Sequence, residues 1–308
     1  MATPTRFADN LTRFMFERAA IRGALVSLDD TCREILGQHS YPPALRRVLA
    51  ELLAASALLA STLSFKGTLI VQLQAGGPVN LLVVECTADL GLRATAQWRG
   101  AAAALPDDAP LQVLAGDPAT SRLAIMLDPK DGGPIYQGIV ALEAASIATL
   151  IEHYLTTSEQ IDSRLVLAAD ATRVRGMLLQ RMPSAGPADD LAWRQVASRL
   201  DLGDTELFGA VGIEALLAAR FPDHDMRVVA PRAARFHCDC SAERVSNALR
   251  MLGRTEIESI LAAQGMVGVT CEFCSHHYSF VAADALALFA PRGGGAGVLP
   301  DAARSSGP

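Results

Sequence analysis

Hydrophobic positions follow two different patterns along this chain, and each pattern predicts its own kind of element. From residue 67 to residue 98, short apolar runs are separated by turns that contain Gly and Pro, which is typical of antiparallel strands. We predict strands at 68–74, 80–87 and 92–98. Residues 44–63 instead carry Ala and Leu around the whole helical circumference, which predicts a helix buried on all sides.

The same patterns continue on both sides of this region. An apolar stretch at 19–27 suits a strand, whereas residues 1–18 suggest a polar arm that runs into a short amphipathic segment. Residues 146–156 place their apolar side chains on one helical face. Further strands are predicted at 122–127, 135–142, 164–169 and 174–182. We therefore expect residues 1–183 to form one α+β core domain that contains an antiparallel sheet.

The pattern weakens after residue 183, where a run rich in Pro, Gly, Ala and Asp predicts a domain boundary. Residues 184–235 contain short helical stretches that are interrupted by glycines. Their apolar side chains include Trp193, Leu207 and Phe208. These provide enough surface to dock on a neighbour, but too little for an independent core. We predict a metastable helical linker.

Paired cysteines mark the next segment, residues 236–290. Cys238 and Cys240 precede a predicted helical insert, and Cys271 and Cys274 follow it. Two close pairs can deliver four sulfurs to one tetrahedral ion, so the spacing predicts a four-cysteine Zn²⁺ site in a small C-terminal zinc-binding domain. The last residues, 291–308, are rich in Gly, Ala, Ser and Pro, and we expect them to be disordered.

Composition and charge limit the compartment and the partners. The N-terminus lacks the uninterrupted apolar core of a signal peptide, and the longest uncharged apolar run, residues 52–65, is too short to span a membrane. We therefore expect a cytoplasmic protein without a membrane partner, in which paired thiols serve metal or redox chemistry. A net charge of −6 argues against nucleic acid as the main partner. The other two cysteines, Cys32 and Cys86, are predicted to be buried.

Three functions fit a closed site of four thiolates, which leaves no position for a reacting water. A zinc clip could hold the small domain together, within an enzyme for example. A zinc ribbon could bind RNA or the ribosome, although Asp239 and Glu272 disfavour a polyanion. In a redox switch, zinc would keep the sulfurs as thiolates, which oxidants attack, and each close pair could form its own disulfide. Loss of zinc would remove on the order of 10–16 kcal/mol, so oxidation should unfold this domain and loosen the linker.

Several short motifs in a fixed order give the chain a specific resemblance. The motifs are Tyr136-Gln137-Gly138, Ser158-Glu159-Gln160, Gly176-Met177-Leu178-Leu179-Gln180, Met182-Pro183, Cys238-x-Cys240-Ser241 and Cys271-x-x-Cys274. With these motifs, the chain from about residue 13 to residue 289 resembles the 33-kilodalton heat-shock protein family, the bacterial redox-regulated holdase chaperones.

This resemblance implies an ATP-independent chaperone, not an enzyme, that is zinc-bound and inactive when reduced. Hypochlorous acid, or peroxide combined with heat, would then expel zinc, unfold the linker and favour a homodimer that binds unfolding client proteins. The implied zinc ligands are Cys238, Cys240, Cys271 and Cys274, and the implied disulfides are Cys238–Cys240 and Cys271–Cys274. Histidines beside the cysteines are alternative ligands, but four sulfurs already fill the tetrahedron. They are His237, His276 and His277.

Overall fold

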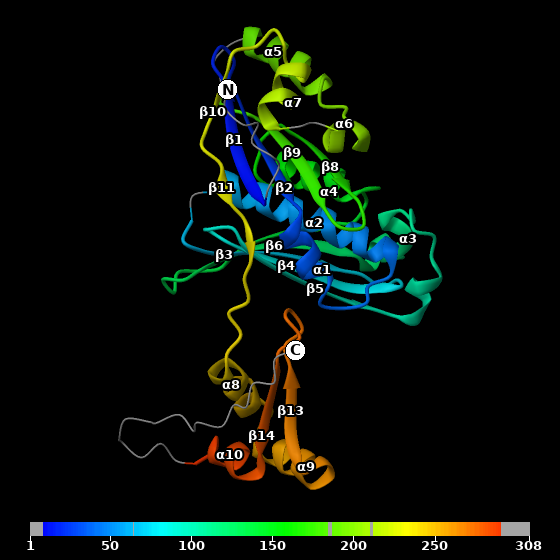
Figure 1. Ribbon diagram of the computed structural model, residues 1–308, viewed down its shortest axis with the longest axis vertical. Coiled ribbons are helices and arrows are strands. Elements are labelled where there is room, and N and C mark those ends of the chain that lie inside the picture. The colour runs from blue at the N-terminus through cyan, green and yellow to red at the C-terminus, as the bar shows by residue number, and fades with distance from the viewer. Residues whose placement is uncertain (1–8, 64, 184–186, 210–211, 291–308) are drawn as a thin grey trace. The chain divides into compact units, whose positions relative to one another are not determined.

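The computed structural model describes residues 9–63, 65–183, 187–209 and 212–290 (Figure 1). The chain divides into two compact units, Met1–His237 and Cys238–Pro308. Helices combined with antiparallel sheets confirm the predicted α+β class. Among the described residues, no helix has both the length and the apolar character that a membrane span requires. The tail that we expect to be disordered, residues 291–308, lies outside the described residues.

One sheet of the larger unit has the strand order β10-β1-β2-β9-β8, and β11 also pairs with β1. Its strands are β1 (Asn10–Phe16), β2 (Ile21–Leu28), β8 (Ser163–Ala169), β9 (Val174–Arg181), β10 (Met226–Val228) and β11 (Arg232–Ala233). The pairing of β1 with β2 requires Gly23, because a Cβ there would lie 2.2 Å from the ring of Phe14. All pairings in this sheet are antiparallel.

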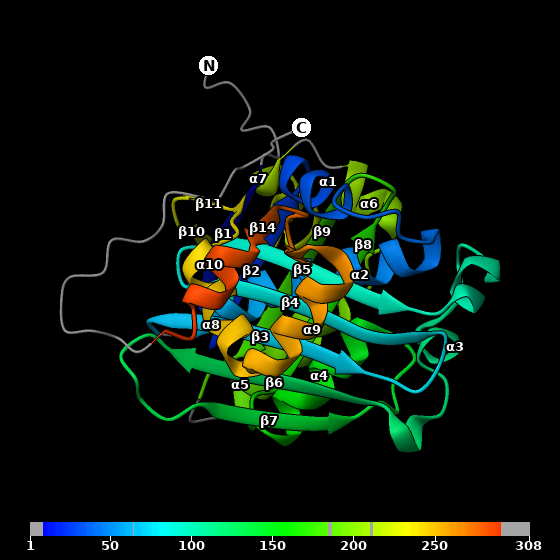
Figure 2. The ribbon, with the colours of Figure 1, turned by 90° about the horizontal axis from the view of Figure 1, so that it is seen from below.

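The second sheet of this unit has the order β12-β5-β4-β3-β6-β7, and its five long strands lie side by side in Figure 2. They are β3 (Gly67–Gln74), β4 (Val79–Thr87), β5 (Gly91–Trp98), β6 (Arg122–Pro129) and β7 (Tyr136–Ala141). Strand β12 (Arg235–Phe236) joins β5 as a parallel edge. The predicted strands are therefore present, but they form two sheets instead of one.

Helix α2 (Pro43–Thr62) lies between the two sheets, which explains its uniform apolar surface (Figure 1). Its Leu and Ala side chains share one core with Val26 and Leu178 of the first sheet and with Val71 and Val84 of the second. Further helices of this unit are α1 (Asp30–Leu36), α3 (Leu111–Ala115) and α4 (Ile147–Thr157), with 3₁₀ turns at Gly100–Ala104 and Pro118–Thr120. The predicted central core helix is thus confirmed.

In the described part of the linker, three helices cover the opposite face of the first sheet (Figure 1). They are α5 (Pro187–Ser198), α6 (Asp204–Gly209) and α7 (Ile213–Arg220). Phe221, which follows α7, packs edge-on against Phe16 of β1, with 5.3 Å between the ring centroids. The buried Arg175 of β9 donates from Nη1 to the carbonyl oxygens of Leu207, at 2.7 Å, and Phe208, at 3.3 Å. One charged side chain therefore holds the C-terminal end of α6 against the sheet.

Two expectations for this unit need correction. Residues 10–16, which suggested an arm and an amphipathic segment, form strand β1 instead. Its two faces contact different cores, so a single amphipathic pattern cannot describe it. The linker is not only helical, because it also supplies β10, β11 and the first of the two residues of β12. The division into residues 1–183, 184–235 and 236–290 stays a prediction.

The smaller unit builds a separate core around a two-stranded sheet. Its elements are α8 (Ala242–Leu252), α9 (Arg254–Gln264), β13 (Met266–Thr270), β14 (His277–Val281) and α10 (Ala282–Ala287). Leu249, Ile257, Val267, Tyr278 and Phe280 are the largest buried side chains of this core. With so few buried apolar groups, the unit needs a further source of stability.

Candidate metal centre

The four paired cysteines lie at two bends of the smaller unit. Cys240 directly precedes Ser241, whose Oγ accepts a hydrogen bond from the backbone N–H of Arg244 at 3.2 Å and so caps α8, as the sequence predicts. The other bend connects β13 to β14. Its ends are pinned by hydrogen bonds from the Cys271 N–H to the carbonyl of His276 and from the Ser275 N–H to the carbonyl of Cys271, both 2.9 Å.

These two bends bring four sulfurs together. The Sγ atoms of Cys238, Cys240, Cys271 and Cys274 all lie within 4.8 Å of one another. Cys238 Sγ is 3.8 Å from Cys271 Sγ, and Cys240 Sγ is 3.4 Å from Cys274 Sγ, so none of these contacts is a disulfide. A tetrahedral ion with Zn–S bonds of about 2.3 Å separates its sulfurs by about 3.8 Å. The arrangement therefore fits one zinc ion.

The electrostatics of the cluster also favour a cation. Burial raises the pKa of the Cys274 thiol, and the nearby sulfurs of Cys240, Cys238 and Cys271 raise it further. Four thiolates this close would repel one another, so they need a compensating charge at their centre. Zn²⁺ supplies that charge and prefers sulfur ligands. The donor set thus satisfies the chemical requirement for zinc as well as the geometric one.

Tyr278 is a further residue of the site that sequence reasoning missed. Its hydroxyl donates a hydrogen bond to Cys240 Sγ at 3.1 Å, and its ring is buried in the core of the smaller unit. Burial raises the pKa of this hydroxyl, and the bond to Cys240 raises it further, so Tyr278 stays protonated and remains a donor. A tyrosine four positions after the last cysteine was the available signal, but the contact depends on the fold.

The histidines beside the cysteines lie outside this cluster. Within the described residues, the group of His, Cys, Asp and Glu side chains close enough to hold a metal consists of the four cysteines. His277 Nδ1 lies 3.1 Å from Thr270 Oγ1, and the His276 ring packs against Tyr278 with 4.6 Å between centroids. Asp239 forms an ion pair with Arg244 at 2.7 Å. These groups surround the sulfur cluster without joining it.

The two remaining cysteines belong to the core of the larger unit, as predicted. Cys32 of α1 and Cys86 of β4 are fully buried. Burial raises the pKa of each thiol to about 12. Both therefore remain neutral thiols at physiological pH and are poor targets for oxidants.

Comparison with known proteins agrees with this site. The family described as Hsp33 protein matches residues 9–281 of the chain. The 33 kDa chaperonin of Methylobacillus flagellatus is 43% identical over 287 residues, which cover 92% of this chain and 95% of the relative. That of Chromobacterium violaceum is 42% identical over 286 residues, with 91% and 94% covered.

A solved structure shares the fold. The crystal structure of the 33 kDa chaperonin from Thermotoga maritima superimposes with a TM-score of 0.74 at 20% sequence identity, covering 91% of this chain and 98% of the other. Since the resemblance anticipated this family from short motifs, the match confirms it over nearly the whole chain. The chain belongs to the Hsp33 family of 33 kDa chaperonins, which are redox-regulated chaperones and not enzymes.

Proposed function

We propose that this protein is an ATP-independent holdase whose zinc ligands are Cys238, Cys240, Cys271 and Cys274. The observation that carries the proposal is the convergence of the four sulfurs within 4.8 Å, at a spacing that fits one zinc ion. Bound zinc keeps the sulfurs deprotonated and holds the two bends together. In this reduced state the linker helices stay docked and the chaperone is inactive.

Activation is the oxidation of each close pair to a disulfide, Cys238–Cys240 and Cys271–Cys274. With hypochlorous acid, one thiolate attacks chlorine and releases hydroxide, and the second sulfur then displaces chloride as the S–S bond forms. Peroxide reacts through a sulfenic acid in the same way and releases two hydroxide ions for each disulfide. Two oxidant molecules therefore remove four electrons from the site, and the sulfurs lose the charge that binds the cation.

Loss of the metal matters because the smaller unit has little else to stabilise it. Structural zinc contributes on the order of 10–16 kcal/mol, comparable to the net stability of a typical small domain. The buried apolar core of this unit is small, so oxidation should unfold it. Cys238 follows strand β12 after a single residue, and His237 N–H donates to the carbonyl of Leu92 at 2.9 Å. Unfolding at the cysteines thus begins next to the point where β12 pairs with β5.

Release of the linker would expose an apolar surface for clients. The side chains of Val196, Leu200, Leu207 and Phe221 are buried in the second core together with residues of β1 and β9. Separation of these layers would present apolar groups from both sides to unfolding proteins, which expose similar surfaces. Exposed apolar surfaces also associate with each other, so we propose that the oxidised form is a homodimer. We place its action in the cytoplasm, where protein thiols are normally kept reduced.

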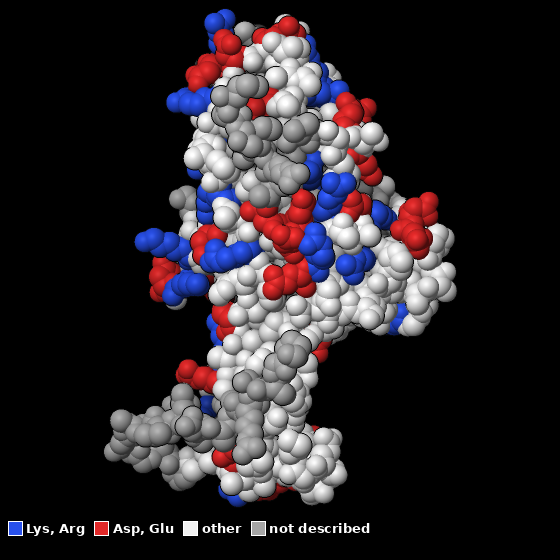
Figure 3. Space-filling model, viewed as in Figure 1, with Lys and Arg blue, Asp and Glu red and all other residues white. Residues whose placement is uncertain are grey.

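A nucleic-acid function has less support. Basic and acidic side chains are intermingled over the larger unit on the face that Figure 3 shows. Binding to a polyanion favours clustered positive charge, and the net charge of the chain is −6. We therefore propose proteins, and not nucleic acids, as the partners.

The direct test measures zinc, free thiols and aggregation of an unfolding client before and after oxidation. We expect oxidised protein to suppress aggregation as zinc and four thiols are lost, whereas equal suppression by the reduced form would reject the switch. Cys271→Ser should lower the zinc content and loosen the smaller unit. Cys86→Ser is the matched control and should keep its metal, because Cys86 is buried in the other unit.

A further inference from the structure

Among the described residues, the outer edge of strand β1 is covered by short pieces of the linker. Strand β10 has three residues and β11 has two, whereas β1 has seven. The Val229 N–H donates to the carbonyl of Arg13 at 2.8 Å, and the Glu17 N–H donates to the carbonyl of Asp225 at 3.0 Å. When the linker leaves, these main-chain groups of β1 lose their partners. An edge strand with unpaired N–H and C=O groups is a template for another strand.

Apolar groups flank this edge on the side of the linker helices. Phe14 and Phe16 point into the second core, where Phe16 packs against Phe221. On β10, Met226 pairs with Phe16 and packs against the same core, and Val228 pairs with Phe14. Alternate residues of β10 therefore place apolar side chains beside the aromatic rings of β1.

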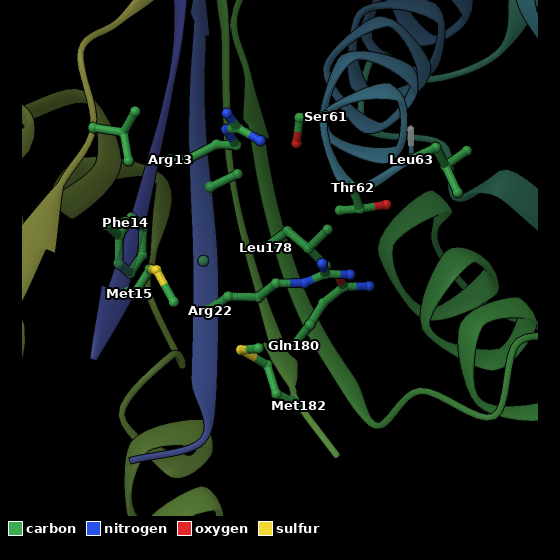
Figure 4. Close-up of a pocket in the computed structure, with 13 residues that line it drawn as sticks. Arg13, Phe14, Met15, Arg22, Ser61, Thr62, Leu63, Leu178, Gln180 and Met182 are labelled. Carbon is green, nitrogen blue, oxygen red and sulfur yellow. The ribbon is translucent and has the colours of Figure 1, made fainter. Parts of the chain in front are cut away.

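The other face of the same edge borders a cavity of about 460 Å³ (Figure 4). It forms beyond the end of α2, where the helix no longer covers the sheet. Figure 4 shows Met15 and Arg13 of β1 on one side and Thr62 of α2 on the other, with Leu178 between them in this view. Val229 of the linker also lines the cavity.

Two guanidinium groups set the charge of this cavity. Arg22 Nε donates to the buried Gln180 Oε1 at 3.0 Å, and Arg13 lies close enough to lower the pKa of Arg22 in addition to the larger effect of burial. The cavity thus offers room for one large side chain, favours apolar or acidic groups, and disfavours a lysine or arginine.

We propose that the outer edge of β1, once vacated by β10, binds an extended segment of the client protein as an added antiparallel strand. This inference rests on the proposed function and names the surface and the partner. In the reduced protein, strand β10 of the linker occupies this edge, and a client segment would pair with β1 in the same antiparallel geometry. Main-chain hydrogen bonds do not depend on side-chain identity, so this mode suits a chaperone with unrelated clients. Side chains at alternate positions of the client meet the aromatic rings of β1 and the cavity.

Amide hydrogen exchange of full-length oxidised protein, resolved by residue, tests the pairing. The Arg13 carbonyl and the Glu17 N–H both face β10. Because hydrogen-bonding directions alternate along an antiparallel strand, the Met15 N–H also faces β10. The N–H groups of Phe14 and Phe16 face β2 instead. We expect oxidation to speed exchange at Met15 and Glu17, and added client to slow it by about fivefold or more, as one net hydrogen bond implies. Phe14 and Phe16 are internal controls and should remain protected throughout.

Three outcomes would overturn the proposal. If client is captured while Met15 and Glu17 stay unprotected, strand addition is wrong and the holdase function stands. If their protection appears without client and increases with the concentration of the protein, the edge pairs with a second copy instead. If oxidised protein captures no client, both the function and this inference fail.

A peptide of residues 224–233 provides a second test with the same oxidised protein. Methylation of the Val229 nitrogen removes the donor to Arg13, whereas the Val228 nitrogen faces away from β1. The unmodified peptide and the Val228-methylated peptide should displace client, and the Val229-methylated peptide should require a roughly fivefold higher concentration for the same displacement. Equal potency of the two methylated peptides, or no displacement by the unmodified peptide, would contradict a main-chain pairing.

Discussion

Replacement of Phe221 by Ala should activate the protein without oxidation. The Phe221 side chain is fully buried between the linker and β1, where its ring meets Phe16 edge-on at 5.3 Å. Removing a buried Phe costs about 3–5 kcal/mol, including the lost aromatic contact. Because the ring joins the linker to the sheet, most of this cost falls on linker docking. The population of released linker should rise by roughly 10²-fold to 10³-fold, at about 1.4 kcal/mol for each tenfold change.

The assay compares client aggregation in the presence of reduced, zinc-loaded wild type and variant, together with hydrogen exchange where the linker pairs with β1. The exchange of the Val229 N–H, which donates to the Arg13 carbonyl at 2.8 Å, reports release of the linker. Leu191→Ala is the matched control, since Leu191 lies in the same linker but is 52% exposed, and its effect should stay within about 0.5 kcal/mol. A Phe221→Ala protein whose linker exchanges rapidly while it remains inactive would refute the idea that docking controls activity.

The remaining predictions concern the linker anchor and the thiols. Arg175→Met should weaken linker docking by about 2–4 kcal/mol, because two carbonyls of α6 lose a charged donor, and should lower the oxidant dose needed for activation; a dose-response curve in the aggregation assay would show it. Tyr278→Phe should retain zinc but release it about fivefold faster under peroxide, since Cys240 loses a hydrogen bond of about 1 kcal/mol; a colorimetric chelator would follow the release. Cys32 and Cys86, with pKa values of about 12, should resist alkylation at pH 7 in the native protein and react only after denaturation, as peptide mass spectrometry would report.

Elements with a strong local pattern could be predicted from the sequence, and those defined by distant pairing could not. Helix α2 was evident because apolar residues surround it completely, as contact with two sheets requires. Strand β1 was missed because Leu11 faces one core and Phe14 the other, while Arg13 and Met15 border the cavity. Strand β10 has only three residues, too few for a period to be recognised.

The candidate site shows the same limit. The paired cysteines were identified because metal-binding pairs are defined by local spacing, and the fold brings their sulfurs together. Tyr278 was not identified, since its bond to Cys240 spans 38 positions and depends on how β14 packs. Sequence therefore indicates the ligands of such a centre more readily than the groups that tune them.

Close contacts between sulfurs of different bends have a consequence for how the switch can fail. Two such contacts join Cys238 to Cys271 and Cys240 to Cys274. A disulfide formed along either contact would cross-link the two bends and keep them together after the metal is lost. Once one sulfur is oxidised, the outcome depends on which neighbouring thiolate attacks it. Attack from the same pair lets the smaller unit unfold, whereas attack from the other bend gives a cross-linked, inactive protein. A sudden pulse of strong oxidant should therefore give more protein with a disulfide between the bends than a slow exposure, which allows the bends to rearrange first.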